Sequence, residues 1–390
     1  MRVLHVSARL SEGGAAGVAR NLADELRDRD VQSTFLYGYG RSGRPSPLED
    51  TYDTVRLGNR ATAAVQLSAH RILGSELKLH RPGGLESAGR ALAACDVVHV
   101  HVPHSYFLHF PWLVAQVERL KKPWVWTLHD QWTFTGRCAQ PGSCRKWETN
   151  CGACPDLHAY PQALIDHSRR ESLRRRDLLR RMTLSAPHRW VSCAGWLGRE
   201  FGLLGLGSCR VIRNSVDQPF WRALDDPQVK SASPDGRVRV LFINRDLRDR
   251  AKVDWQLLKR IGEDARFELT IVGDDSPHRL AGTRNLDSIS SRGRLVEELR
   301  RNDVLLFTST VDYYPLTVAE ALCAGLPVVA VDSPAAREFE GDGSLARFTS
   351  HQEALDLLYK ARESDGDPSN PKYSPSRMAD EYLDTYREVL

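Results

Sequence analysis

Apolar residues along this chain form short continuous runs. Between these runs lie longer stretches in which polar residues interrupt the apolar ones. In the first half the runs are RVLHVS (2–7), STFLYG (33–38), DVVHVHVP (96–103) and PWVWTLHD (123–130). In the second half they are VRVLFIN (238–244), FELTIVG (267–273), DVLLFTS (303–309) and LPVVAVD (326–332). Continuous apolar strands alternating with helical stretches are typical of parallel sheets covered on both faces. The pattern therefore predicts an α/β fold with two doubly wound domains.

The length of 390 residues also favours two domains, because single hydrophobic cores stop growing well below this size. We expect an N-terminal domain over 1–215, a polar linker rich in Pro, Ser and Asp over 216–236, and a C-terminal domain over 237–372. The closing stretch 373–390 has helical periodicity in its apolar residues and predicts a crossover helix that returns to the first domain. Two such domains facing each other would leave a central cleft, and closure over a ligand would accompany catalysis.

Composition and charge narrow the class of protein. The chain is 41% hydrophobic and 27% charged, and no run approaches the roughly 20 apolar residues that span a bilayer. A net charge of +4 gives no argument for a nucleic-acid partner. The first residues, MRVLHVSARL, become polar too soon for a signal peptide and predict a strand. We therefore expect a cytoplasmic protein.

The segment DYYPLTVAEALCAGLPVV (312–329) carries the strongest candidate site. Pro315 suits a first helical turn and Gly325 a helix end, so a short helix begins at the ligand edge of a parallel sheet. The amides of 316–318 (Leu316, Thr317 and Val318) would face an anion there. Asp312 and Glu320 flank that turn and suit the hydroxyls of a sugar and a ribose on either side of a phosphate. Alternatively, they are a loop residue and a helix-face charge.

Two further loops offer phosphate-binding groups. INRDLRDRAKVDW follows the first strand of the second half and places Arg245 and Lys252 at the same edge, where they would clamp a diphosphate. In SEGGAAGVA, Gly13 and Gly14 allow a ligand to approach backbone amides closely. The alternatives are exposed loop charges and a tight strand-to-helix turn.

Histidines lie near strand ends in the first half. In WTLHD, His129 could reach the donor sugar or orient an acceptor, and Asp130 could hold the acceptor. In VHVHV, His101 is nearer the strand end and could reach the acceptor, whereas we expect His99 to be structural. A hydrogen-bonded buried histidine is the alternative for His129.

The segment 168–182, SRRESLRRRDLLRRM, is strongly basic. A solvated helix face explains it, and so does a peripheral helix that rests on an anionic membrane surface through residues such as Arg174, Arg175 and Arg176.

Four cysteines gather in an insertion over 138–154, CAQPGSCRKWETNCGAC. The ligand set would be Cys138, Cys144, Cys151 and Cys154. Clustered thiols in a cytosol favour a structural zinc over disulfides, and the final C-x2-C pair suits two thiolates on one metal. Two disulfides or four free thiols remain the alternatives.

Taken together, GGAAGVARNLADEL, DVVHVHVP, VIRNSVDQPFW, LTIVGDD and DYYPLTVAEALCAGLPVV resemble the retaining nucleotide-sugar glycosyltransferases of family 4, which have the GT-B fold of two Rossmann-like domains. The last piece matches the family's Glu-x7-Glu motif, with Asp312 in place of the first Glu. The resemblance implies that Glu320 holds the donor ribose, that Asp312 holds the transferred sugar, and that Arg245 and Lys252 neutralise the diphosphate. It implies no catalytic metal.

Within that family the resemblance is closest to bacterial exopolysaccharide transferases of the colanic-acid type. It implies a UDP- or GDP-sugar donor of hexose type and a saccharide or lipid-linked saccharide acceptor, with no nucleic acid. Three alternatives stay open. They are a secondary-metabolite glycosyltransferase, a phosphorylase or epimerase on the same fold, and a degenerate module that binds a sugar nucleotide without catalysis, which Asp312 favours.

Overall fold

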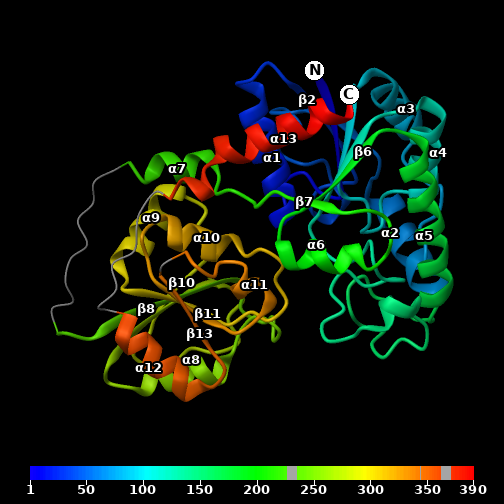
Figure 1. Ribbon diagram of the computed structural model, residues 1–390. Coiled ribbons are helices and arrows are strands. Elements are labelled where there is room, and N and C mark those ends of the chain that lie inside the picture. The colour runs from blue at the N-terminus through cyan, green and yellow to red at the C-terminus, as the bar shows by residue number, and fades with distance from the viewer. Residues whose placement is uncertain (226–234, 343, 362–369) are drawn as a thin grey trace. The chain divides into compact units, whose positions relative to one another are not determined.

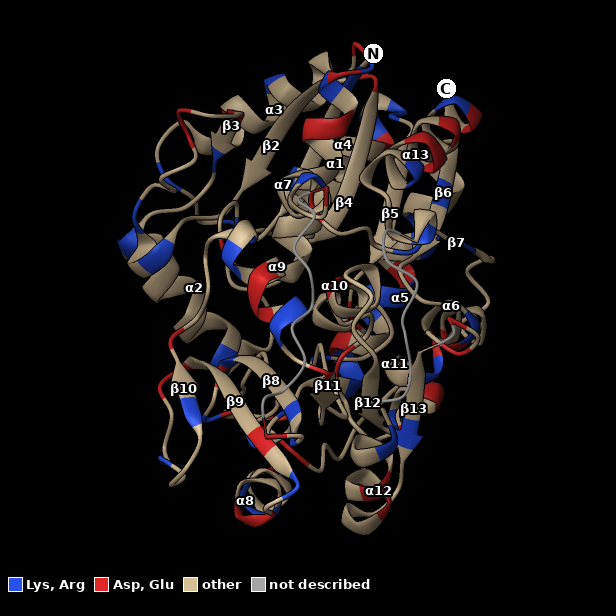
Figure 2. Ribbon diagram, turned by 90° about the vertical axis from the view of Figure 1, so that its left-hand side faces the viewer, with Lys and Arg blue, Asp and Glu red and all other residues tan. Residues whose placement is uncertain are grey.

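The computed structural model describes residues 1–225, 235–342, 344–361 and 370–390 (Figure 1). The chain divides into two compact units, one of Met1–Arg213 with Met378–Leu390 and one of Asn214–Arg377. The helix α7 (Gln218–Ala223) lies in the stretch expected to be a linker and belongs to the second unit. Residues 226–234 of that stretch lie outside the described residues. In both units Lys and Arg are interspersed with Asp and Glu (Figure 2).

The first unit is built on a parallel sheet in which seven described strands follow the order β3-β2-β1-β4-β5-β6-β7. The strands are β1 (Arg2–Ser7), β2 (Gln32–Tyr37), β3 (Asp53–Arg56), β4 (Val97–Val102), β5 (Trp124–Leu128), β6 (His188–Ser192) and β7 (Cys209–Val211). The order reverses between β1 and β4. In open α/β sheets, ligands bind beyond the carboxyl ends of the strands at such a reversal.

Helices cover both faces of this sheet. They are α1 (Gly14–Arg27), α2 (Arg60–Leu73), α3 (Gly84–Ala94), α4 (Phe110–Leu120), α5 (Ser168–Ser185) and α6 (Gly195–Gly202), with short 3₁₀ turns at Arg41–Gly43 and Lys146–Thr149. On one face Trp124 donates its indole N–H to the carbonyl of Met182 in α5. On the other face Phe35 packs with Ala19 and Ala23 of α1. Strands covered in this way need continuous apolar runs, as the sequence has.

The C-terminal helix α13 (Pro375–Val389) contributes its last residues to the first unit (Figure 1, red). Tyr386 and Tyr382 are fully buried there. Their hydroxyls lie 2.7 Å from Nδ1 of His99 and 2.8 Å from Oγ1 of Thr127. The predicted return of the closing helix to the first domain is confirmed.

The second unit has a parallel sheet in which the described strands follow the order β10-β9-β8-β11-β12-β13. They are β8 (Val238–Asp246), β9 (Phe267–Asp274), β10 (Arg284–Leu286), β11 (Val304–Phe307), β12 (Val328–Val331) and β13 (Leu345–Phe348). The order again reverses, here between β8 and β11, so the loops after these two strands share the ligand edge.

Besides α7, the helices of this unit are α8 (Trp255–Glu263), α9 (Arg292–Arg301), α10 (Leu316–Cys323), α11 (Pro334–Arg337) and α12 (His351–Ala361), with a 3₁₀ turn at Pro371–Tyr373. Leu257 and Leu258 of α8 and Leu355 of α12 share one core with Val240 and Leu269 of the sheet. This core fixes one face of the sheet, and α10 lies in the segment that links β11 to β12. The predicted two-domain α/β architecture is therefore confirmed.

Candidate functional site

The first turn of helix α10 forms part of the candidate donor site of the second unit. The helix follows β11, and its N-cap is Pro315, which supplies no side-chain hydrogen bond to the first turn. The amides of 316–318 have no acceptor among the residues described. Gly325, just past the helix, has φ +74°, a conformation that glycine adopts without strain. The predicted short helix is therefore present, with uncapped amides in its first turn, and anion binding by these amides stays a prediction.

Asp312 lies just before this turn and forms an ion pair. Its Oδ1 accepts a hydrogen bond of 2.8 Å from Nζ of Lys252, which comes from the loop after β8. The two side chains are 23% and 26% exposed, so both remain accessible. The sequence separates these residues by 60 positions, and the sheet order brings them together. An anion at the helix terminus would meet Lys252 as well as the free amides.

Glu320 lies inside α10, and its side chain is only 12% exposed. Nη1 of Arg292, the first residue of α9, lies 3.3 Å from its Oε1, and Arg292 also pairs with Asp217. Burial raises the pKa of Glu320 to about 7, although Arg292 opposes this rise. A buried carboxyl group whose pKa is raised towards neutral pH is typical of functional sites. Sequence reasoning missed Arg292, because nothing in the local pattern links it to Glu320.

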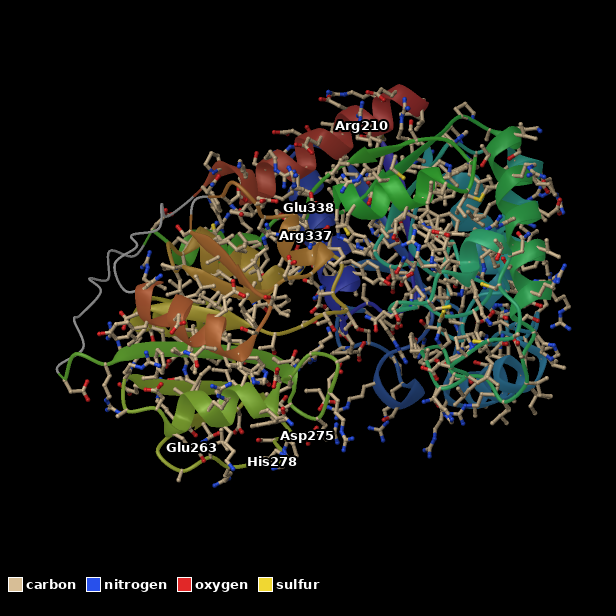
Figure 3. The ribbon with its side chains drawn as sticks, turned by 60° about the horizontal axis from the view of Figure 1, so that its bottom comes forward. Arg210, Glu263, Asp275, His278, Arg337 and Glu338 are labelled. Atoms are coloured by element: carbon tan, nitrogen blue, oxygen red, sulfur yellow. The ribbon has the colours of Figure 1, made fainter. Side chains whose placement is uncertain are left out.

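The basic loop after β8 divides its charges among different partners. Arg248 pairs with Asp246 and, at 2.9 Å, with Asp275 (labelled in Figure 3). Arg245 is exposed near the end of β8. Arg250 lines a cavity of about 490 Å³ together with Thr308 and Thr310, which follow β11, and with the last residues of β12 and β13. Of these cations, Lys252 is the one in direct contact with the Asp312 carboxylate.

The glycine loop of the first unit leads from β1 into α1. Gly13 is the N-cap residue, with φ +92°, and no side chain caps the helix. A methyl group placed at Gly13 or Gly14 would meet no atom within 4 Å. The glycines therefore leave open space in front of the first helical turn, as a ligand against backbone amides requires.

His129 and Asp130 follow β5 directly, at the carboxyl edge of the first sheet. Oδ2 of Asp130 lies 2.8 Å from Nε2 of His104, and its Oδ1 accepts from the amide of Trp132 at 2.9 Å. Burial alone would raise the pKa of Asp130, but His104 and this amide outweigh it, so the pKa lies below its usual value. Ser105 continues the network, since its Oγ lies 2.9 Å from Nδ1 of His104.

His104 and Ser105 were not among the predicted site residues. They follow β4 in the stretch PHSY, and Ser105 has φ +81°, a strained conformation for a residue other than glycine. The only signal in the sequence was a third histidine close after the VHVHV strand. The structure shows that Asp130 is already engaged by His104, with its side chain 20% exposed.

His101 is enclosed inside the first unit at 2% exposure. Its Nε2 lies 3.1 Å from His5 and its Nδ1 lies 3.1 Å from His129. Both nitrogens are therefore occupied, so direct contact with an acceptor, as predicted, would require breaking these bonds. His99 bonds Tyr386 and Thr127 within the core, as a structural histidine does.

The four clustered cysteines lie in the loop between β5 and α5 and are free thiols. Among the described residues, no three of their sulfurs come within 4.8 Å of one another. The buried Arg137 and Arg175 border the cluster, and Nη2 of Arg137 lies 3.6 Å from Sγ of Cys154. Burial raises the pKa of the Cys138 thiol to about 11, so ionisation requires a nearby cation. The zinc site stays a prediction.

The basic segment forms α5, and its arginines divide between two faces. Arg175 is buried, with its guanidinium 3.6 Å from the ring centre of Trp132, and Arg176 donates to the carbonyl of Trp147. Arg175 is therefore not available to a membrane surface, whereas Arg176 is only partly buried. Contact of this segment with a membrane stays a prediction. The exposed residues of α5, here called the basic face, are Arg169, Arg170, Leu173, Arg174, Asp177, Arg180, Arg181 and Leu184. Within the described ranges, no helix has the length and apolar character that a membrane span requires.

Two parallel α/β units, with a glycine-opened helix in one and a cation–carboxylate cluster at a helix terminus in the other, define a two-domain protein of the GT-B class. The chain belongs to glycosyltransferase family 4, because the family described as "Glycosyltransferase Family 4" matches residues 12–218. A second family, "Glycosyl transferases group 1", matches 237–361.

One curated relative is the putative colanic acid biosynthesis glycosyl transferase WcaC of Escherichia coli (strain K12), which is 32% identical over 415 aligned positions that cover all of both chains. Among solved structures, Anabaena Alr3699/HepE in complex with UDP matches with a TM-score of 0.59 at 13% identity, over 100% of this chain and 96% of that one. The apo lipopolysaccharide outer core galactosyltransferase WaaB matches with a TM-score of 0.59 at 13% identity, over 99% and 97%. These structural matches show the shared fold.

Proposed function

We propose that this glycosyltransferase is a retaining enzyme that moves a hexose-type sugar from a UDP- or GDP-sugar to a saccharide or lipid-linked saccharide. The observation that carries the proposal is the cluster at the start of α10, where Lys252 meets Asp312 beside three amides without acceptors. This cluster offers cations and N–H donors to a diphosphate and carboxylates to the hydroxyls on either side of it. HepE was solved with UDP and with UDP-glucose, which supports a nucleotide-sugar donor.

The chemistry follows from where charge develops. Glycosyl transfer passes through an oxocarbenium-like state while negative charge grows on the departing nucleoside diphosphate. Lys252, Arg245 and the amides of 316–318 would stabilise that charge. Glu320, as the ionised carboxylate, would accept hydrogen bonds from the ribose hydroxyls. Asp312 would exchange its bond with Lys252 for the hydroxyls of the transferred sugar once the diphosphate takes the ammonium group.

The first unit would supply the acceptor side. His129 has its Nδ1 without a hydrogen-bond partner among the described residues, and Asp130 lies next to it at the same edge of the sheet. We assign His129 to the reacting sugar or the acceptor hydroxyl, and Asp130 to acceptor binding. Gly13 and Gly14 would let the donor approach the backbone at the start of α1.

The relative named for colanic acid biosynthesis supports a role in bacterial exopolysaccharide assembly. A lipid-linked saccharide acceptor in such assembly would be met at the cytoplasmic face of the membrane. The basic face of α5 fits this setting. Next to it, Ile72, Leu73 and Leu164 are 47%, 45% and 70% exposed, and His167 ties the two segments by a bond of 2.9 Å to the carbonyl of Ile72. Arginines around exposed apolar side chains suit an anionic bilayer surface.

The experiment is a panel of UDP- and GDP-sugars incubated with the purified protein, with and without polyprenyl diphosphate-linked saccharides, while nucleoside diphosphate release is measured. We expect one donor to be turned over, with release that rises when an acceptor is added. Release that no acceptor stimulates would contradict transfer, and donor binding without any release would favour the module without catalysis. The anomeric configuration of the product, read by NMR, tests retention.

A further inference from the structure

Three histidines form a continuous hydrogen-bonded line through the interior of the first unit. Nδ1 of His5 lies 3.1 Å from Nε2 of His101, and Nδ1 of His101 lies 3.1 Å from Nε2 of His129. The residues come from β1, from β4 and from the end of β5, which are neighbours in the sheet. Consecutive rings are stacked with centres 5.4 Å apart. We call these three residues the imidazole row.

The imidazole row has two distinct ends. At one end, Nε2 of His5 lies 3.2 Å from Oγ of Ser33, the second residue of β2. Ser33 lines an opening of about 1090 Å³ at the amino ends of β1, β2 and β3. At the other end, Nδ1 of His129 has no partner among the described residues and lies at the carboxyl edge, beside Asp130. The row therefore joins opposite edges of one sheet, and only one of them carries the candidate site.

The row has two self-consistent states. A neutral imidazole has one N–H and one acceptor nitrogen. If each ring carries its proton on Nε2, every bond points from His129 towards Ser33, and if each carries it on Nδ1, every bond points the other way. Burial lowers the pKa of His5 to about 3 and that of His129 to about 4, and it holds the pKa of His101 well below the usual value. All three rings are therefore neutral near pH 7.

A metal site is the competing account, because nitrogens of His5, His99 and His101 lie within 4.8 Å of one another. Each of the six ring nitrogens already has a hydrogen-bond partner, however, and those of His99 are Tyr386 and Thr127, outside the row. A metal would have to displace several of these bonds. The groups that face the row from the neighbouring strands are hydroxyls and the rings of His99 and Phe35. The carboxylate whose charge acts on the row is that of Asp130, which follows His129 and is hydrogen-bonded to His104.

We propose that the imidazole row is a proton path between the opening at the amino ends of the strands and the candidate active-site edge. Through it, Nδ1 of His129 presents a lone pair in one state and an N–H in the other. The use of this path in catalysis rests on the proposed glycosyl transfer, whereas the existence of the path does not. In this role His129 is the residue that meets the substrate, and His101, His5 and Ser33 act through it.

The proton balance is as follows. The acceptor hydroxyl passes its proton to Nδ1 of His129, whose Nε2 proton moves to Nδ1 of His101. In the same sense, His101 passes its Nε2 proton to His5, His5 passes one to Oγ of Ser33, and Ser33 releases its own to water. The acceptor oxygen bonds the sugar carbon as the carbon–phosphate oxygen bond breaks and leaves its electron pair on the diphosphate. The reverse movement then brings one proton from water to the diphosphate through His129 and resets the row.

The first test needs no activity. The valine of Ser33→Val and the threonine of Ser33→Thr have the same shape, but only threonine keeps the hydroxyl. In the valine variant a methyl group fills the position of the hydroxyl and excludes water from it. In ¹⁵N-histidine-labelled full-length protein, NMR would follow the ring tautomers and the exchange of the His101 ring N–H with D₂O. We expect exchange to be at least tenfold slower in Ser33→Val than in the wild type and in Ser33→Thr. Equal exchange in both variants, with equal thermal midpoints, would overturn the path.

The second test uses turnover. His101→Gln can still donate and accept hydrogen bonds, but a carboxamide cannot pass a proton along the row. His99→Gln, two residues away on the same strand and equally buried, is the matched control. We expect kcat to fall in His101→Gln by ~10²-fold, the lower end for a lost proton-transfer group. KM should stay unchanged and the solvent deuterium isotope effect on kcat should be altered, whereas His99→Gln should keep the wild-type isotope effect.

An equal loss of kcat in the two glutamine variants, with the same isotope effect, would make the row merely structural. If the wild-type protein transfers no sugar from any donor, the proposed function fails instead. In that case the NMR comparison of the Ser33 variants still decides whether the path exists.

Discussion

Glu320→Gln is the most informative change in the candidate donor site. The side chain keeps its shape, but the carboxylate that Arg292 holds at 3.3 Å becomes a neutral amide with one acceptor oxygen. Removing a charged hydrogen-bond partner costs about 1–3 kcal/mol, which corresponds to a rise of roughly 5- to 150-fold in Kd. We expect a rise in that range for the nucleoside diphosphate that the wild type binds, measured by calorimetry with UDP and GDP.

The pH dependence sharpens this prediction. With a pKa of about 7, Glu320 is about one-tenth ionised at pH 6 and about nine-tenths at pH 8. The affinity of the wild type for the nucleotide should therefore rise about tenfold from pH 6 to pH 8, relative to the Gln variant. In the Gln variant only the titration of the nucleotide itself changes the affinity. The folded pKa is raised above the ordinary value of 4.5, so Glu320 makes the empty protein lose stability as pH rises from about 4.5 to about 7, and the loss is complete above 7. The Gln variant should lack this loss in thermal scans.

The matched control is Glu298→Gln. Glu298 is another buried acid of the second unit and pairs with Arg284 at 2.6 Å through both oxygens, but it lies in α9 against β10 and outside the cluster at α10. This variant should lose stability and keep its nucleotide affinity. A Glu320→Gln protein with wild-type Kd and the wild-type pH profile would refute the ribose assignment.

Three further predictions concern other parts of the chain. Asp312→Glu should shift the kcat/KM ratio between two donor sugars while changing the Kd for the free nucleotide less than about threefold, because the ammonium–carboxylate pair survives; unchanged donor preference would remove Asp312 from the sugar. Serines at Arg169 and Arg174 of the basic face should weaken binding to anionic vesicles by about 2 kcal/mol, or about 30-fold, and the loss should shrink at high salt. Serines at the exposed Arg41 and Arg44 are the charge-matched control, and an equal loss there would reduce the effect to net charge. Protein purified without added metal should contain about one zinc per chain, and a metal-free, fully active protein with all four clustered thiols alkylated would exclude that site.

The sequence predicted the interior strands well and the edges poorly. Each apolar run that it singled out lies in a strand with at least two neighbours, namely β1, β2, β4, β5, β8, β9, β11 and β12. The four edge strands β3, β7, β10 and β13 were missed, as was β6 next to β7. An edge strand is covered less completely, so its residues are partly polar and leave no continuous apolar run.

Local pattern also determined the helix that holds the candidate donor site. Pro315 and Gly325 delimit α10 within one residue, because their backbone preferences act without distant partners. Local pattern did not determine which distant residues contact this helix and its first turn. The contact of Lys252 with Asp312 spans 60 residues and that of Arg292 with Glu320 spans 28, and both depend on the order of the strands.

The histidines show the same division most clearly. The sequence by itself placed His99 and His101 on one face of a buried strand and His129 at a strand end, because strand residues alternate between faces with period two. Only the tertiary structure decided that β1 would lie between β2 and β4, with His5 against His101 and Ser33 at the far end. Which strands become neighbours is set by how helices pack over the whole sheet, and no short stretch of chain contains that information.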